Sequence, residues 1–113
     1  MEVKLKERDG VTVASLSGKL AAGVGDRQLH DLLDELLAEN RKRILLDLSG
    51  VTGIDSSGVG ELVAAYTSIA NRGGQLKLLN VTKKIQDLLQ ITQLLTVFET
   101  YDNEAEALAS YRS

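Results

Sequence analysis

The sequence predicts an α/β fold, with a mixed, mostly parallel sheet of about five strands and about four helices. Three observations support this prediction. Strand-like apolar runs alternate with segments whose apolar residues recur at helical spacing, a pattern typical of crossover connections. Two alternating segments flank the turn residues Asp9 and Gly10, which indicates an opening antiparallel pair. The run 44–48 is apolar at four of five positions, as expected for a central strand covered on both faces.

The composition favours one small protein-binding domain. A chain of 113 residues with 43% hydrophobic residues can build a single core, so we assign one domain to residues 1–113. The net charge is -3 without an acidic or basic block, which predicts neither nucleic acid nor an anionic membrane as partner. The chain lacks cysteine, a signal-peptide core and a run of membrane-spanning length. We therefore expect a cytoplasmic protein without membrane insertion.

The first part of the chain contains two strands and one helix. Strands are expected over 3–5 and 11–16, with Gly18 ending the second. The connector 23–25 contains two glycines without the lysine of a phosphate-binding loop, and we expect it to be flexible. Asp26 is the expected N-cap of the first helix. The apolar stripe of that helix consists of Leu29, Leu32, Leu33, Leu36 and Leu37.

Three further helices are expected after the central strand. The second helix should end at the stop signal 71–74, and a short strand follows over 76–79. Thr82 is expected to cap the third helix, the run 97–101 to form the last strand, and either Asp102 or Asn103 to start the last helix. The apolar stripes of these helices are Val59, Leu62, Val63, Tyr66, Ile69 and Ala70, then Ile85, Leu88 and Leu89, then Leu108 and Tyr111.

We expect function at the strand-to-helix turn 53–60, whose sequence is Gly-Ile-Asp-Ser-Ser-Gly-Val-Gly. Its glycines permit close approach of another molecule, and its polar residues can accept hydrogen bonds from free N–H groups at a helix start. A phosphate on a hydroxyl here would be stabilised by those N–H groups and the helix dipole. Asp55 is expected to cap the helix rather than to orient the Ser56 hydroxyl, and Ser57 to be structural. The turn itself can be a cap, a switch, or both.

The stretch 44–62 closely resembles the signature of STAS domains, specifically of the bacterial anti-sigma-factor antagonists. The resemblance continues in order through 72–76, 80–81, 85–95, 97–101 and 105–108, so it covers most of the chain. It implies the STAS fold. In this family the serine directly after the aspartate is phosphorylated by a partner anti-sigma factor that is also a serine kinase, and that serine corresponds to Ser56 here.

The resemblance also implies a partner-switching cycle in transcription regulation. The unphosphorylated antagonist binds the anti-sigma factor and frees the sigma factor. The phosphorylated antagonist releases the anti-sigma factor, and a protein phosphatase restores the unphosphorylated form. Self-association stays open. The residues expected to contact the partner are Leu20, Ala21, Asp55, Ser56, Ser57, Gly58 and Val59.

One stretch departs from the family pattern. Many antagonists carry an aspartate in a Gly-x-hydrophobic-Asp pattern after the second strand, whereas residues 18–21 read Gly-Lys-Leu-Ala. This loop is expected beside Ser56, at the same end of the sheet. Ala21 therefore keeps an alternative open, a constitutive STAS docking subunit of a transporter-associated or signalling complex that is not phosphorylated. An enzyme is disfavoured, because the chain shows no metal or cofactor constellation, no Ser-His pairing and no phosphate-binding loop.

Several residues allow a structural and a functional interpretation. Gly58 and Gly60 are each unfavourable by about 1 kcal/mol relative to alanine in a helix interior. Either the close approach of a partner or loop, or packing against the sheet, can explain them. Val59 and Leu62 fit a core stripe at least as well as an exposed contact surface.

Two polar residues outside the turn also have open roles. His30 has no cysteine or second histidine near it, and we expect it on a helix surface. Asp47 interrupts the apolar central strand, and it is expected to pair with a loop N–H or with Lys42 or Arg43.

Overall fold

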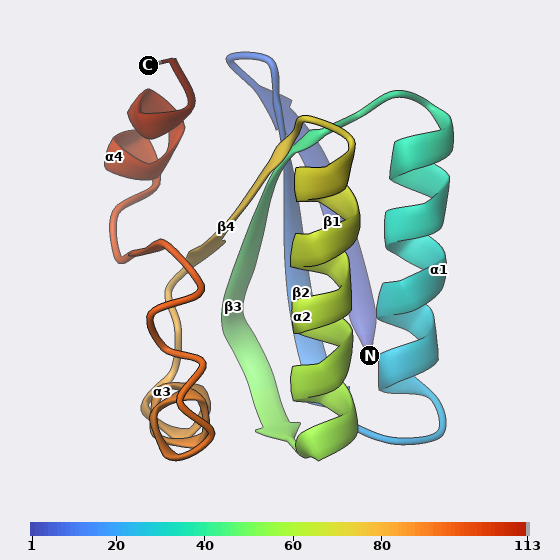
Figure 1. The fold of residues 1–113 in the computed structure, drawn as a ribbon, viewed down its shortest axis with the longest axis vertical. Coiled ribbons are helices and arrows are strands. Elements are labelled where there is room, and N and C mark those ends of the chain that lie inside the picture. Colours follow the sequence, from blue (N-terminus) through green and yellow to red (C-terminus); the bar gives the residue numbers. More distant parts are fainter. Residues whose placement is uncertain (113) are drawn as a thin grey trace.

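The structure, a computed structural model, describes residues 1–112 and confirms the α/β class. Five strands, four α-helices and one short 3₁₀ helix are present in this part of the chain (Figure 1). In chain order they are β1 (Glu2–Arg8), β2 (Val11–Leu20), α1 (Gly25–Ala38), β3 (Arg43–Ile54), α2 (Ser56–Asn71), β4 (Gln75–Leu79), α3 (Lys83–Ile91), β5 (Thr100–Tyr101), α4 (Glu104–Ala109) and η1 (Ser110–Arg112).

The strands form one mixed sheet in the order β1-β2-β3-β4-β5. β1 and β2 pair antiparallel, and the other neighbours pair parallel, which confirms the predicted opening pair. β3 is the central strand, with Leu45 in register with Val13 on one side and Lys77 on the other.

Helices cover both faces of the sheet and create two cores. α1 and α2 lie side by side on one face, and α4 lies on the other (Figure 1). The larger core contains Ile44 and Leu46 of β3 together with residues of α1, α2 and α3, whereas the smaller core contains Leu45 with Leu108 and Tyr111. Because successive side chains of a strand point to opposite faces, the apolar run of β3 is buried on both of them, as predicted.

Every strand differs from its predicted bounds at one end or both, and β1 extends over Glu2–Arg8 instead of 3–5. β2 does not end at Gly18 but continues to Leu20, because Gly18 adopts a positive φ of 102° where the register with β3 shifts. β3 is longer than 44–48 and reaches Ile54. The last strand is shorter than 97–101, because Phe98 turns into the core, where its ring packs edge-on against Tyr66 with ring centroids 5.5 Å apart.

The predicted start of α1 is wrong. Asp26 is not the N-cap, because α1 begins one residue earlier, at Gly25. Val24 occupies the cap position without a capping side-chain hydrogen bond. The Asp26 carboxylate instead accepts a hydrogen bond from the neighbouring Arg27 N–H in the first turn (N···O 2.7 Å).

The other two predicted polar caps outside the turn are confirmed. Thr82 Oγ1 accepts a hydrogen bond from the Ile85 N–H (3.3 Å) at the start of α3. Asn103 Oδ1 accepts one from the Glu106 N–H (3.0 Å) at the start of α4. α2 ends at Asn71, as the stop signal predicts.

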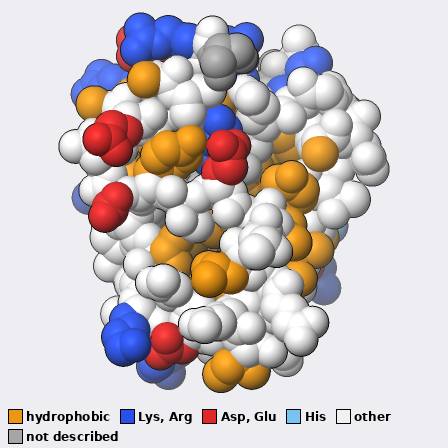
Figure 2. Space-filling model, turned by 60° about the vertical axis from the view of Figure 1, so that its left-hand side comes forward, with side chains coloured by type: hydrophobic (Ala, Val, Ile, Leu, Met, Phe, Trp, Pro, Cys, Tyr) orange, Lys and Arg blue, Asp and Glu red, His pale blue; other side chains and the backbone are white. Residues whose placement is uncertain are grey.

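The two ends of the sheet differ in chemistry. The carboxyl end of β3 leads directly into α2, at the bottom of Figure 1. The amino ends of β3 and β4 lie at the top, where Lys and Arg side chains gather in Figure 2. The turn 53–60 and this basic end are therefore separated by the length of β3.

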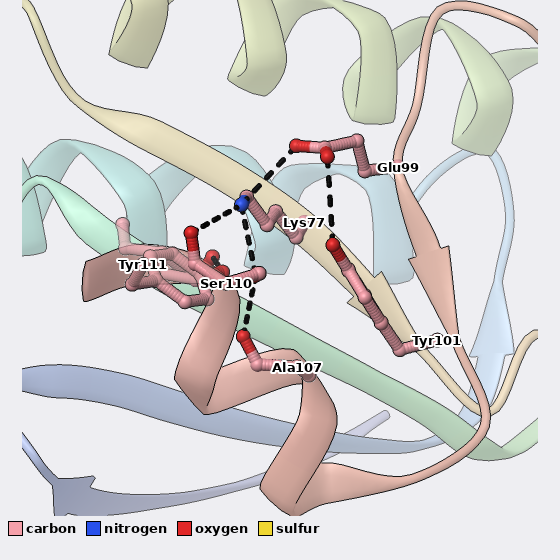
Figure 3. Close-up of polar contacts among 7 residues, drawn as sticks. Lys77, Glu99, Tyr101, Ala107, Ser110 and Tyr111 are labelled. Atoms are coloured by element: carbon pink, nitrogen blue, oxygen red, sulfur yellow. Dashed lines mark hydrogen bonds and ion pairs between the residues drawn. The ribbon is translucent and has the colours of Figure 1, made fainter. Parts of the chain in front are cut away.

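A buried lysine holds the end of the chain against the sheet (Figure 3). Lys77 on β4 is only 4% exposed, and its Nζ donates to Ser110 Oγ (2.8 Å) and pairs with Glu99 (3.2 Å). The same nitrogen lies 4.8 Å from the ring centroid of Tyr111, whose hydroxyl donates to the Ile44 carbonyl. Burial raises the pKa of Tyr111, which keeps that hydroxyl a donor. Sequence reasoning did not find this cluster.

Candidate functional site

The turn between β3 and α2 is organised by Asp55. Its backbone is extended, and its Oδ1 accepts a hydrogen bond from the Gly58 N–H (3.0 Å), which confirms the predicted cap. Its Oδ2 accepts a second hydrogen bond, from the Ala22 N–H (3.0 Å). One carboxylate therefore joins the start of α2 to the loop between β2 and α1. This contact confirms that the loop lies beside the turn.

Ser56 is the first residue of α2 and is exposed. Among residues 1–112, no group forms a hydrogen bond with its hydroxyl. The side chain stands at the positive end of a 16-residue helix, where an added negative charge is stabilised. Asp55 is not seen to orient this hydroxyl, because its oxygens accept from backbone N–H groups. Ser56 is therefore free for modification or for contact with a partner.

Two glycines allow the helices to start directly against the end of β2. A Cβ atom on Gly58 would lie 2.1 Å from the Leu20 carbonyl oxygen, and one on Gly25 would lie 2.1 Å from the Lys19 carbonyl oxygen. Neither position has room for a side chain. Packing within the fold thus explains Gly58, and the prediction of a flexible connector is wrong for Gly25, which is buried in α1.

Gly60 differs from Gly58. It is exposed, and a Cβ atom built on it would meet nothing within 4 Å. Nothing within residues 1–112 requires a glycine at this position of α2. Of the two explanations that the sequence left open, packing against the sheet does not apply here.

The structure divides the predicted contact residues into two layers. Leu20 is fully buried and Val59 is 4% exposed, so both side chains belong to the core rather than to a contact surface. Gly58 is buried with them, and Leu62 confirms the core stripe of α2. The remaining predicted residues reach the surface: Ala21, Asp55 and Ser57 in part, and Ser56 fully.

Sequence reasoning missed two residues of the loop beside the turn. The Ala22 contact is made by a backbone N–H, which no side-chain pattern reveals. Val24 is 66% exposed, although it is apolar. Residues 21–24 carry no charged side chain, and the Ala22 N–H joins this loop to Asp55, the residue before Ser56.

His30 lies on the surface of α1, as predicted. Its Nε2 lies 3.3 Å from Asp34 Oδ2, and its Nδ1 lies 3.5 Å from Glu61 Oε2 on α2. A hollow of about 310 Å³ opens beside it, lined by Gly23, Asp26, Arg27, His30 and Glu61. Through Gly23, this hollow borders the same loop that contacts Asp55.

Asp47 has a structural role in the central strand. Its Oδ1 accepts hydrogen bonds from the Ser49 N–H (3.0 Å) and from Asn80 Nδ2 (3.4 Å). No ion pair joins it to Lys42 or Arg43 in the described part of the chain, so that alternative is wrong.

The environment of Asp55 predicts a pH-dependent stability. The Ala22 N–H, and then the Gly58 N–H, lower the pKa of Asp55 by stabilising the carboxylate. A group with a lowered folded-state pKa stabilises the fold above its unfolded pKa, and this contribution is lost as the pH falls through the folded value. We expect Asp55→Asn to be less stable than the wild type at pH 7, and the difference to shrink in acid.

Urea denaturation at neutral and acidic pH measures this effect. Asp31→Asn, which removes an exposed carboxylate on α1, is the matched control for the change of charge. A stability difference for Asp55→Asn that is independent of pH would contradict the assigned role of the two N–H groups.

Two further features bear on the kind of site. No group of three or more His, Cys, Asp or Glu side chains in residues 1–112 is arranged to hold a metal ion. None of the helices in the same residues is long and apolar enough to cross a membrane.

Comparison with known proteins places this geometry in context. The model of the STAS domain matches residues 2–107. A curated relative, the anti-sigma F factor antagonist of Paenibacillus polymyxa, is 27% identical over 108 residues, which cover 96% of this chain and 92% of the relative.

Solved structures share the fold. The anti-sigma factor antagonist SpoIIAA superposes with a TM-score of 0.75 at 20% identity in its unphosphorylated form, covering 99% of both chains. Its phosphorylated form, from Bacillus, has the same TM-score and identity and covers 96% of this chain and 98% of that one. A sulfate transporter family protein from Wolinella succinogenes reaches a TM-score of 0.77 at 25% identity, covering 91% of this chain and 85% of that one.

Proposed function

The chain belongs to the STAS domain family, and on this premise we propose that it acts as an anti-sigma-factor antagonist. It binds an anti-sigma factor with serine kinase activity, is switched off by phosphorylation at Ser56, and is restored by a protein phosphatase in the cytoplasm. The observation that carries the proposal is the exposed Ser56 hydroxyl at the start of α2, without a hydrogen-bond partner in residues 1–112. The name of the Paenibacillus polymyxa relative supports this class of partner.

The position of Ser56 suits a charge switch. A phosphate adds about -1.5 to -2 charges and three acceptor oxygens at neutral pH. The free N–H groups and the dipole of α2 tolerate this charge, so the fold survives the modification. A partner surface that closes over Ser56 would instead bury the phosphate charge beside the Asp55 carboxylate without an opposite charge to pair with. Binding of the partner is lost for this reason.

The proposed contact surface consists of the exposed residues around Ser56. The loop contributes Ala21 and the 66% exposed Val24, and α2 contributes Ser56, Ser57 and Gly60. Since Gly60 has open space where a side chain would stand, a partner can approach the α2 backbone closely there. The buried residues beneath support this surface without touching the partner.

In the proposed cycle the chemistry of phosphoryl transfer belongs to the kinase partner. Both carboxylate oxygens of Asp55 accept hydrogen bonds from backbone N–H groups and not from the Ser56 hydroxyl. Asp55 is therefore not placed to act as a base. The partner positions the nucleotide and the hydroxyl. The chain itself is a binding protein and a kinase substrate, and it needs no cofactor.

Mass spectrometry of the protein from the cells that make it tests the proposal. The peptide containing Ser56 should carry a phosphate in a fraction that differs between growing and stressed cells. Ser56→Ala should abolish this phosphate, whereas Ser57→Ala, one residue away, should retain it. If the peptide is unmodified in every condition, the switch is wrong and the constitutive docking subunit becomes the better hypothesis.

A further inference from the structure

A second feature of the molecule lies at the end of the sheet opposite Ser56. A hollow of about 800 Å³ opens there between the amino ends of β3 and β4 and the turn between β1 and β2. Basic side chains gather along this end in Figure 2. The lining consists of Glu7, Gly10, Thr12, Asn40, Arg41, Lys42, Arg43, Gly73, Gly74, Gln75 and Tyr111.

Two of its cations are explained by contacts within the fold. Arg41 pairs with Glu7 (2.7 Å) and with Glu39 (3.0 Å). Lys42 Nζ donates to the carbonyl of Arg72 (3.2 Å), at the C-terminal end of α2, where a positive charge is favourable. These two residues complete the structure and do not by themselves indicate a ligand.

Arg43 and Arg72 have no such explanation. Both are exposed, and no carboxylate in residues 1–112 forms an ion pair with either guanidinium. Arg43 lines the hollow. Arg72 precedes the lining residue Gly73 in the sequence, and its backbone carbonyl accepts a hydrogen bond from Lys42, which also lines the hollow. A guanidinium presents its donors in a planar fork that matches a carboxylate or phosphate. One guanidinium without an ion pair in residues 1–112 lines the hollow, and a second belongs to the residue next to the lining residue Gly73, which favours an anionic partner.

The lining distinguishes between kinds of anion. Tyr111 is its only aromatic residue, and it is 3% exposed with its hydroxyl bonded to the Ile44 carbonyl, so no open ring is available to stack a base. Glu7 lies among the cations, and the chain carries a net charge of -3, which opposes a long polyanion such as nucleic acid. A short acidic segment needs no ring to stack on and carries fewer charges, and Glu7 is already paired with Arg41 (2.7 Å).

We propose that this hollow binds a short acidic segment of a partner protein, with carboxylates paired to Arg43 and Arg72. β3 separates the hollow from Ser56, so the acidic segment and the anti-sigma factor occupy opposite ends of the sheet. The protein can then hold two partners at once. This second surface does not depend on the phosphorylation of Ser56.

Titration of the full chain with hexaglutamate, followed by amide NMR, tests the proposal. Shifts should concentrate at residues 41–43 and 72–75 and leave the Ser56 turn unchanged. The double variant Arg43→Glu/Arg72→Glu should lower the affinity for hexaglutamate at least tenfold. The double variant Arg43→Gln/Arg72→Gln should lower this affinity less. The double variant Lys4→Glu/Lys84→Glu changes the net charge by the same amount as Arg43→Glu/Arg72→Glu, at exposed sites elsewhere. It should lower the affinity for hexaglutamate less than twofold.

Three results would overturn the proposal. One is a spread of small shifts over lysines and arginines across the whole surface. Another is an equal loss of affinity in the two charge-reversal variants, which would indicate only a response to net charge. The third is binding of inorganic pyrophosphate or of an oligonucleotide, but not of hexaglutamate, to the same amides.

Discussion

Replacement of Ser56 by aspartate is expected to leave the fold intact and to weaken binding of the anti-sigma factor by roughly 30-fold or more. The carboxylate stands at the N-terminus of α2, where the helix dipole stabilises a negative charge. In the complex it would be buried without a partner, beside Asp55. Leaving a buried charge unpaired at an interface costs about 2–5 kcal/mol. Calorimetric titration of the anti-sigma factor measures the loss directly.

Two matched variants identify the origin of this effect. Ser56→Ala removes the hydroxyl without adding charge and should bind as the wild type does. Ser68→Asp places the same charge on an exposed position of α2, about 18 Å further along the helix, and should also bind normally. Equal affinities of Ser56→Asp and Ser56→Ala would show that charge at this position does not control binding. Unfolding of Ser56→Asp would contradict the exposed position of Ser56.

Gly58→Ala is expected to destabilise the fold by about 2–3 kcal/mol, the upper part of the range for overpacked sites. The added Cβ would lie 2.1 Å from the Leu20 carbonyl oxygen and 3.0 Å from Ile54 Cγ1. The carbonyl belongs to β2, which pairs with β3, so the oxygen cannot move aside without disturbing the sheet. This strain exceeds the gain in helix propensity, which is about 1 kcal/mol.

Gly60→Ala is the control, two residues further along the same helix. Its Cβ meets nothing within 4 Å, so the gain in helix propensity remains, and we expect stabilisation by about 0.5–1 kcal/mol. Urea denaturation of both variants at pH 7 gives the two free energies of unfolding. A Gly58→Ala protein as stable as Gly60→Ala would show that the start of α2 can move away from β2.

The order of elements and the centre of the site could be predicted from local signals in the chain. The continuous apolar run around Leu45 predicted a strand buried on both faces, because a strand alternates its side chains between two faces. Asp55 and Thr82 were identified as caps, and Asn103 was one of two candidates for the cap of the last helix; each accepts a hydrogen bond from an N–H three residues ahead. Such signals span a few neighbouring residues, so a single sequence contains them.

The meeting of distant segments could not be predicted in this way. Asp26 has the right chemistry for a cap, yet α1 starts at Gly25, where the helix lies so close to the Lys19 carbonyl that a side chain has no room. The Ala22 N–H reaches Asp55 across 33 positions, and the hollow near Arg43 brings together residues from the distant segments 7–12, 40–43 and 73–75. These contacts depend on backbone groups and on how the strands pair. The pattern of side chains within one segment contains no information about the backbone of another segment or about strand pairing.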